Sequence, residues 1–335
     1  MRLALGLLGV SLMTAAAGER ALSRILFGSC IRQDRPIPIL KTILADEPEM
    51  FIFLGDNIYG DTADMSVMRA KYDRLGAIPE LRSLRKNAHI IATWDDHDYG
   101  QNDGGADFGP RKESQQEFTR FWGERSRRGE GVYDSHILGP RGRRVQIILL
   151  DTRYFRGPLK MGERRVGGPY YPTENKNVTM LGEAQWKWLA EELRKPADLR
   201  IVASSIQCIP EASGQETWSN LPHERQRFFD LVRTTKANGV LVISGDRHWS
   251  EFSVLRDRVG YPVYEFTSSS LNQLHKRGTP TANRYRAIPT SFHLENYGRL
   301  SIVWDADDPV IQSEIVDQEG VVRISKTILL SELQP

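Results

Sequence analysis

The sequence predicts a layered α/β fold, because short apolar segments alternate with helical patterns along most of the chain. Apolar runs such as 50–54 and 240–244 are typical of buried strands, whereas apolar residues recur at helical spacing over 39–44 and 184–193. The C-terminal part has few helical patterns, which indicates a sheet completed by antiparallel strands. Those strands are expected at 261–268, 299–304, 310–316 and 321–328.

The composition is that of a folded chain rather than a disordered one. The 335 residues are 40% hydrophobic and 26% charged, and no tract rich in Pro, Gly or Ser is long enough to divide them. We therefore expect a single domain over residues 18–335. The formal net charge is +2, with Lys and Arg spread along the chain, so we expect no nucleic-acid partner.

The N-terminus has the order of a secretory signal peptide. Arg2 precedes an apolar run over 3–13, and three alanines follow at 15–17. The run is short for a bilayer span, and no later stretch resembles a transmembrane helix. We predict a signal peptide over 1–17 and a secreted or periplasmic protein without stable membrane insertion. A buried first helix or strand is the alternative.

Several predicted strands run directly into a polar cluster. Ligands of α/β sheets collect in the loops beyond the carboxyl ends of strands, so six such loops are expected to converge on one site. The segment 157–180, rich in Gly, Pro and Tyr, predicts a long loop that borders it. The clusters are Gly28-Ser29-Cys30, Gly55-Asp56, Asp95-Asp96-His97-Asp98, Asp151, Gln207-Cys208 and Gly245-Asp246-Arg247-His248.

The first informative cluster lies in the stretch 55–61. Asp56 directly follows a predicted strand, where a carboxylate can bridge two metal ions through its two oxygens. Tyr59 can return its phenolate to one of these ions. An Asp after a Gly is also a common turn residue or helix cap, and this alternative stays open for Asp56 taken alone.

The second cluster, over 94–99, contains four titratable residues in succession. Asp96 can ligate a cation, and His97 can donate a proton to a leaving oxygen because imidazole titrates near neutrality. A solvated acidic turn is the alternative. In the third cluster, Asp246 and His248 lie two residues apart, so both can point inward from an extended loop toward a hard or borderline cation.

The chain has two cysteines, Cys30 and Cys208. In an oxidising compartment they can form one disulfide. The position of Cys30 at the end of the first core strand favours another role. Asp61, Asp98 and Asn102 are candidates to orient ligands, although loop caps have the same composition.

Taken in chain order, these clusters resemble the metal-binding blocks of the metallophosphatase superfamily. Their departures from its commonest blocks are similar to the alkaline phosphatase D (PhoD-like) family, in which a Cys and a Tyr join the metal shell. Asp151-Thr152-Arg153 and the segment 181–189 also match this family, so the resemblance spans about residues 25 to 270. It implies a four-layer sandwich of two mixed β-sheets flanked by helices.

The resemblance also implies a metal centre of iron (Fe³⁺) and calcium (Ca²⁺), although other divalent metals fit such ligands as well. Asp56 would bridge the two ions. The remaining ligands would be Cys30, Tyr59 and His248 on iron and Asp96 and Asp246 on calcium.

The same match makes His97 the catalytic proton donor to the leaving alcohol or a contact to the phosphoryl group. We also expect Asn57 and Arg153 to contact the substrate. For Arg153, an ion pair with Asp151 is the alternative. The superfamily's lone-His block has no His here, only Gln207 and Cys208.

We therefore predict a metal-dependent phosphoester hydrolase in which a metal-activated water attacks the phosphorus. Its substrates would be small or polymeric extracellular phosphoesters, and we expect a monomer. One alternative is a phosphodiesterase acting on phospholipids or teichoic-acid-like polymers. A homologue that binds metal or phosphate without turnover is the alternative of another class.

Overall fold

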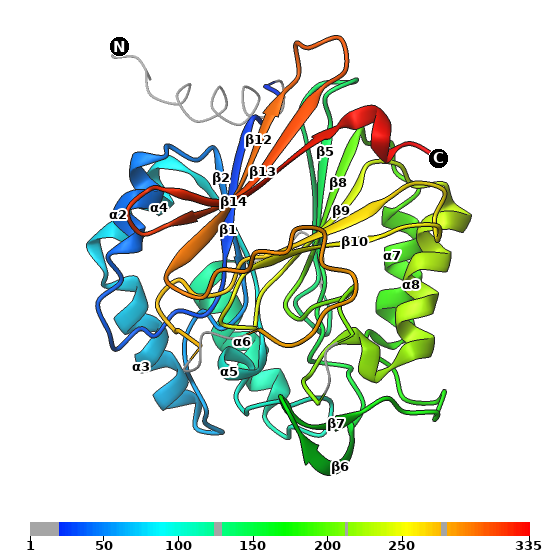
Figure 1. Ribbon diagram of the computed structural model, residues 1–335. Helices are drawn as coiled ribbons and strands as arrows, with labels where there is room; N and C mark the ends of the chain where they lie inside the picture. The colour runs from blue at the N-terminus through cyan, green and yellow to red at the C-terminus, as the bar shows by residue number, and fades with distance from the viewer. Residues whose placement is uncertain (1–19, 124–128, 212–213, 276–279) are drawn as a thin grey trace, which may run out of the picture.

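The computed structural model describes residues 20–123, 129–211, 214–275 and 280–335, so the expected signal peptide lies outside the described residues. Two six-stranded sheets form the centre of the molecule, and a two-stranded hairpin lies at its lower end (Figure 1).

The first sheet has the strand order β14-β13-β12-β1-β2-β3. Its strands β1, β2 and β3 are parallel, and β12, β13 and β14 extend it in antiparallel pairs from β1. This confirms the predicted antiparallel completion. The strands are β1 (Arg24–Gly28), β2 (Met50–Leu54), β3 (His89–Thr93), β12 (Asn296–Val303), β13 (Val310–Asp317) and β14 (Val322–Leu329).

The second sheet has the order β10-β11-β9-β8-β5-β4, with antiparallel strands only at its two edges. The strand expected at 261–268 is β11, which pairs in parallel with β9 instead of joining the antiparallel extension. The reason is that β10 turns back along the sheet edge, so the chain enters β11 in the direction of β9. The strands are β4 (Asp134–Leu138), β5 (Val145–Leu149), β8 (Leu199–Ser204), β9 (Val240–Ser244), β10 (Glu251–Leu255) and β11 (Val263–Thr267).

Both faces of the central strands are buried. In β2, Met50, Ile52 and Leu54 join a core cluster that continues into the second sheet. Phe51 and Phe53 point the opposite way, into the core beneath the helices of the first sheet. Figure 1 shows α2, α3 and α4 outside the first sheet and α7 and α8 outside the second. The layers are helix, sheet, sheet and helix, which confirms the predicted four-layer sandwich.

The helices predicted at 39–44 and 184–193 are α2 and α7. Helix α8 begins at Pro222, whose fixed φ and missing N–H suit a first turn. Among the described residues, no helix is long and apolar enough to cross a membrane. The helices are α2 (Ile39–Ala45), α3 (Met65–Gly76), α4 (Pro79–Asn87), α5 (Asp96–Tyr99), α6 (Arg111–Trp122), α7 (Gly182–Glu192) and α8 (Pro222–Thr235), with 3₁₀ turns η1 (Trp218–Asn220) and η2 (Leu330–Leu333).

The segment 157–180 is not the continuous loop that its composition predicted. It contains the hairpin of β6 (Lys160–Arg165) and β7 (Gly168–Tyr171). Strand β6 is almost entirely exposed and carries no alternation of apolar and polar residues, so no periodic signal marked it as a strand.

Candidate metal centre

The loops at the carboxyl ends of strands from both sheets meet at one place, as predicted. Two glycines permit the close approach. Gly55 has φ of 99°, and a Cβ there would lie 2.5 Å from the Cβ of Asp95 in the loop after β3. A Cβ on Gly245, after β9, would lie 2.5 Å from Ser29 Oγ in the loop after β1. The Gly245 N–H also donates to the Ser205 carbonyl at 3.0 Å, which joins the loop after β8.

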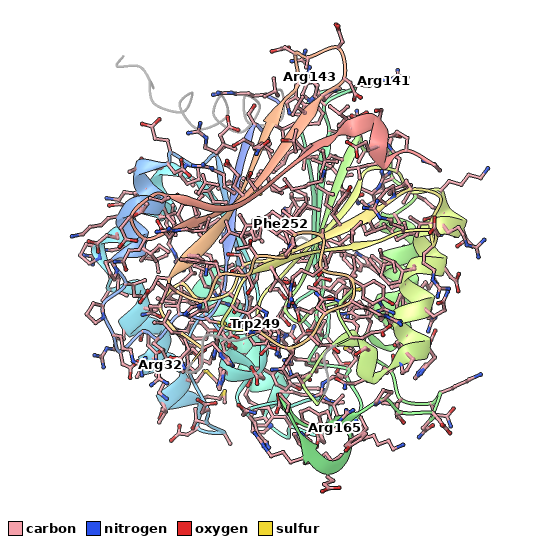
Figure 2. The ribbon with its side chains drawn as sticks, in the orientation of Figure 1. Arg32, Arg141, Arg143, Arg165, Trp249 and Phe252 are labelled. Atoms are coloured by element: carbon pink, nitrogen blue, oxygen red, sulfur yellow. The ribbon has the colours of Figure 1, made fainter. Side chains whose placement is uncertain are left out.

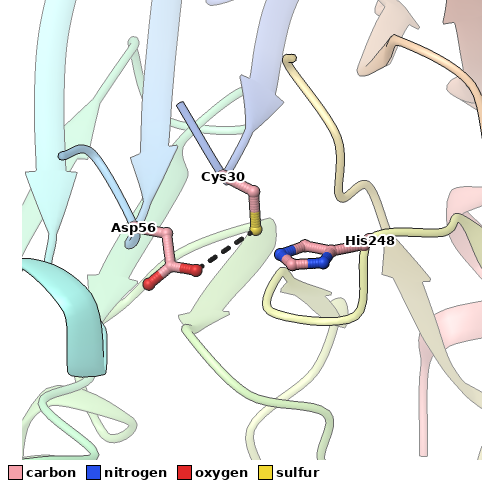
Figure 3. A group of neighbouring side chains, drawn as sticks. All are labelled: Cys30, Asp56 and His248. Atoms are coloured by element: carbon pink, nitrogen blue, oxygen red, sulfur yellow. Dashed lines mark hydrogen bonds between the residues drawn. The ribbon is translucent and has the colours of Figure 1, made fainter. Parts of the chain in front are cut away.

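Cys30, Asp56 and His248 form the first group of possible metal ligands, with donor atoms all within 4.8 Å of one another (Figure 3). The Sγ of Cys30 lies 3.5 Å from Oδ2 of Asp56. The Tyr59 hydroxyl donates to the same Asp56 oxygen at 3.2 Å and lies 3.0 Å from Nε2 of His248. The structure thus brings together the four residues that the resemblance assigns to iron.

Four of the predicted ligands have a left-handed backbone. The φ angles are 65° at Cys30, 51° at Asp56, 66° at Asp246 and 57° at His248. Side chains other than glycine rarely adopt this region, and such strain gathers at functional sites, where the surrounding structure must maintain it. The conformation turns each chain sharply at a strand end and directs the side chain to the common centre.

Cys30 is fully buried, and burial raises the pKa of its thiol well above the ordinary value. A thiolate there needs a cation beside it. The hydroxyls of Ser29 and Ser269 each lie 3.2 Å from its Sγ. Cys208 belongs to a separate network, in which its N–H donates to Glu265 Oε1 at 2.9 Å. Both cysteines are free, so the disulfide alternative is wrong.

Asp96 belongs to a second group. Its carboxylate lies within 4.8 Å of donor atoms of Asp56 and His97, and also within 4.8 Å of Asp95 and Asp246 in a further set. Burial raises the pKa of Asp96, but the positive charges of Arg153 and His97 outweigh burial and bring this pKa to about 2. Asp96 is therefore ionised and able to ligate a cation.

His97 is held by a carboxylate and an aromatic ring. Its Nδ1 lies 2.6 Å from Asp61 Oδ1, and its ring centroid lies 4.1 Å from that of Tyr59. Burial lowers the pKa of His97, but the charges of Asp56 and Asp96 and the hydrogen bond to Asp61 raise it to about 11. Asp61, one of the residues expected to orient a ligand, thus contacts the predicted proton donor His97 directly.

Asp98 is a buried scaffold for the loops after β2 and β3. Its Oδ1 accepts hydrogen bonds from the N–H groups of Asp56, at 3.1 Å, and Asp95, at 2.7 Å. Its Oδ2 accepts from Asn57 Nδ2 at 2.6 Å, and that amide also donates to the Thr93 carbonyl at 2.8 Å. The Oδ1 of Asn57 is buried without a hydrogen-bond partner. The free atom is an acceptor, which suits a cation better than a phosphate oxygen.

The guanidinium of Arg153 is completely buried between two carboxylates. Its Nε and Nη2 lie 2.5 Å from Asp95 Oδ1, and its Nη1 lies 2.7 Å from Glu216 Oε2. The alternative ion pair with Asp151 is wrong, because Asp151 Oδ1 accepts the backbone N–H of Arg153 at 2.9 Å while the side chain extends elsewhere. A guanidinium with no exposed surface and two anionic partners is placed to hold Asp95 rather than to meet solvent.

Gln207 and nearby Ser205 occupy the segment where the superfamily has its lone His. The amide Nε2 of Gln207 donates to Glu251 Oε1 at 2.9 Å and to Thr267 Oγ1 at 3.0 Å, and its Oε1 is buried without a hydrogen-bond partner. Ser205, two residues earlier, reaches the site, and its Oγ donates to Asp95 Oδ1 at 2.7 Å. The hydroxyl of Ser205 therefore contacts a carboxylate of the cluster.

Sequence reasoning missed several residues that complete the site. Asp103 and Glu216 have carboxylate oxygens within 4.8 Å of each other and of Asp96. Neither directly follows a strand, so no local signal could have found them. Arg247, whose Nη1 lies 3.3 Å from Asp246 Oδ2, was visible inside the third cluster but had no assigned role.

The residues present fit a pair of cations. Asp56 Oδ1, Asn57 Oδ1 and Asp95 Oδ2 are buried and have no hydrogen-bond partner. Burial raises the pKa of both Asp56 and Asp95 well above the ordinary value, so ionised forms need positive charge beside them. Thiolate, phenolate and imidazole suit a transition metal, whereas carboxylates suit a hard cation.

Comparisons with known proteins agree with this chemistry. The PhoD-like phosphatase family matches residues 27–303. Alkaline phosphatase D of Bacillus subtilis (strain 168) is 26% identical over 206 residues, which cover 54% of this chain and 34% of that protein. The match thus spans about a third of the length of this curated relative.

Solved structures share the fold. A structure of PhoD superposes with a TM-score of 0.74 at 18% identity, covering 93% of this chain and 73% of the other. Purple acid phosphatase PPD1 of yellow lupin (Lupinus luteus) has a TM-score of 0.60 at 11% identity, covering 93% and 55%. A dimetal phosphatase from Danio rerio has a TM-score of 0.53 at 12% identity, covering 92% and 99%. Because the family match takes in most of the sequence, the chain belongs to the PhoD-like phosphatase family.

Proposed function

We propose that this protein hydrolyses phosphoesters with two bound cations. The observation that carries the proposal is the meeting of a thiol, a phenol, an imidazole and several buried carboxylates at strand ends of both sheets. Buried carboxylates are costly unless a positive charge compensates them, so a purely structural role does not account for this set. Membership of the PhoD-like phosphatase family supports the same reaction class.

The two cation sites would share Asp56, whose Oδ1 is buried and unpaired. Thiolate and phenolate ligands favour a ferric ion in the first site, and carboxylates favour calcium in the second. Other divalent metals fit the second site as well. Beside Asp56, the residues assigned to the first site are Cys30, Tyr59 and His248, and those assigned to the second are Asp96 and Asp246.

When bound, the cations would neutralise charge on the phosphoryl oxygens and supply an activated water as nucleophile. His97 is the proposed proton donor to the leaving alcohol. Its Nδ1 is paired with Asp61 at 2.6 Å, which fixes the ring and leaves the other ring nitrogen for the leaving oxygen. A ring nitrogen of His97 also lies within 4.8 Å of carboxylate oxygens of Asp56 and Asp96, which supports a place at the reacting centre.

Two further roles differ from those expected from the sequence. Asn57 is assigned to the second cation site, since its amide N–H groups are engaged and its buried oxygen is free. Arg153 is assigned as a positioning residue that holds Asp95, because both sides of its guanidinium are engaged by carboxylates. Contact of Arg153 with the substrate would require one of these buried pairs to open.

We place the protein in the periplasm or outside the cell, as a monomer with one domain over 18–335. The order of a basic residue, an apolar run and small residues at the N-terminus supports export. Substrates would then be extracellular phosphoesters, either small molecules or polymers.

Metal analysis of the purified protein beside a substrate panel tests the proposal. The panel contains 4-nitrophenyl phosphate as a monoester and bis(4-nitrophenyl) phosphate as a diester. We expect two cations per chain, iron among them, and turnover that chelation removes and re-addition of metal restores. Full metal content without hydrolysis of either substrate would favour the non-catalytic alternative. Turnover of the diester alone would favour the phosphodiesterase alternative.

His97→Ala separates a proton donor from a metal ligand. We expect turnover to fall by about 10²- to 10⁴-fold with metal content unchanged. The matched control is His89→Ala, because His89 begins β3 at the end opposite the site. Parallel loss of metal and rate in the His97 variant would make this residue a ligand and refute its role as acid.

A further inference from the structure

A cavity of about 670 Å³ lies beside the metal centre and shares His248 with it. Its walls come from the β6–β7 hairpin and from the loops after β8, β9 and β11. No aspartate or glutamate is among the described residues that line it. The polar and cationic lining residues besides His248 are Arg164, Arg165, Gln215, Trp249, Gln273, His275 and Thr281.

Trp249 lines this cavity and has a buried hydrogen-bond donor. The residue is 1% exposed, and its Nε1 has no hydrogen-bond partner. Its ring packs edge-on against His275 at 5.1 Å, and the guanidinium of Arg247 lies 4.4 Å from its centroid. A buried indole N–H without an acceptor is costly, so a ligand oxygen that reached it from the cavity would compensate it.

Two arginines of β6 supply positive charge on the opposite wall. Arg165 Nη2 donates to the Tyr170 carbonyl at 2.6 Å, and its guanidinium lies 3.8 Å from the centroid of the Tyr171 ring, so its position is fixed within the hairpin. Its Nε is buried without a partner. Arg164 is exposed beside it. Figure 2 shows Arg165 on the hairpin at the lower end of the molecule and Trp249 nearer the centre.

Unpaired donors and cations without a lining carboxylate suit an anion rather than a neutral or cationic group. We infer that this cavity binds a second phosphate, carried by the alcohol portion of the substrate, while the scissile phosphate lies at the metal centre. His248 lines both spaces, which makes one molecule able to occupy them together. The inference rests on the proposed function and adds the substrate class: phosphomonoesters whose alcohol bears another phosphate.

A matched pair of substrates tests the inference. Propane-1,3-diyl bisphosphate and 3-hydroxypropyl phosphate differ by one phosphate, and release of inorganic phosphate from each gives kcat/KM at constant ionic strength. The bisphosphate has two equivalent esters, which by themselves would make its kcat/KM about twice that of the monophosphate. We expect a ratio at least about tenfold larger than this statistical value.

The variants Arg164→Gln and Trp249→Phe test the wall of the cavity. Each should lower the ratio of the two kcat/KM values by about threefold or more, since each removes one donor to the second phosphate. Arg164 is exposed, so its substitution should leave the fold intact even if the tryptophan variant does not fold. The matched control is Arg141→Gln, which removes the same charge from an exposed position at the opposite end of the molecule (Figure 2) and should not change the ratio.

The outcomes separate this inference from the proposed function. If neither substrate nor 4-nitrophenyl phosphate is hydrolysed by metal-loaded protein, the proposed function fails. If 4-nitrophenyl phosphate is hydrolysed but the wild-type ratio stays near two, only the second-phosphate subsite is refuted. A preference that Arg141→Gln lowers as much as Arg164→Gln would reflect overall charge and would also refute the subsite.

Discussion

Replacing Arg153 with Met tests the assignment of this residue as the buried anchor of Asp95. Methionine keeps much of the volume but removes the cation between Asp95 and Glu216, which are 1% and 4% exposed. Breaking a buried pair by removing one partner typically costs about 3–5 kcal/mol, because an uncompensated charge stays inside. We therefore expect a measurable loss of stability.

The contacts of Glu216 indicate how large this loss of stability should be. Arg156 Nε stays 3.1 Å from Glu216 Oε1, so Glu216 keeps one cationic partner and most of the loss comes from Asp95. The lower end of the range, about 3 kcal/mol, is then expected. At about 2.1 cal/mol/K of unfolding entropy per residue, 335 residues give about 0.7 kcal/mol/K, so Tm should fall by about 4 °C.

The assay is thermal unfolding of metal-stripped protein at pH 7, which keeps metal binding out of the comparison. The control is Arg143→Met, since Arg143 and its partner Asp305 are 43% and 82% exposed and such a pair contributes about 0–1 kcal/mol. Burial already holds the pKa of Asp95 well above the ordinary carboxyl value, and removal of Arg153 raises it further, so the difference in stability between the wild type and Arg153→Met grows only as pH rises through the wild-type folded-state pKa. Equally small decreases in Tm for Arg153→Met and Arg143→Met would refute the role of Arg153 as the anchor of Asp95.

The remaining predictions concern the metals and export. Cys30→Ser should remove iron, visible colour and activity, whereas Cys208→Ser should leave all three nearly intact because that thiol is remote from the cluster; colourless wild-type protein with full activity would contradict the iron assignment. Asp56→Asn should lower the content of both cations, since one carboxylate would neutralise both ions and an amide does so poorly; normal stoichiometry and rate would exclude a bridge. Intact mass of exported protein should show cleavage near Ala17, and a mature chain that retains Met1 would remove the argument for export.

Much of the architecture was predictable because its signals are local. Apolar runs and helical spacing identified the central strands, α2 and α7, and polar residues directly after strands identified most of the possible ligands. Parallel strands bring their carboxyl ends to one edge, so a position immediately after a strand already predicts a place in the site. Cys30, Asp56, Asp96 and His248 could be chosen on this ground and on the family resemblance.

Other features depend on contacts that no local pattern contains. Glu216 lies late in the loop after β8, just before η1, and Asp103 follows α5, so neither is next to a strand end. Only the tertiary fold brings them to Arg153 and Asp96. The hairpin β6–β7 had no periodic signal because both faces of β6 are largely exposed.

The sequence by itself therefore determined the layers, the order of the strand-end clusters and the donor types that a metal centre needs. The tertiary structure decided which carboxylates Arg153 holds, that the Gln207 amide donates to Glu251, and that a cationic cavity opens beside His248. The physical reason is that hydrophobic periodicity is a property of neighbours in the chain, whereas ion pairs and cavities depend on distances between residues far apart in the sequence.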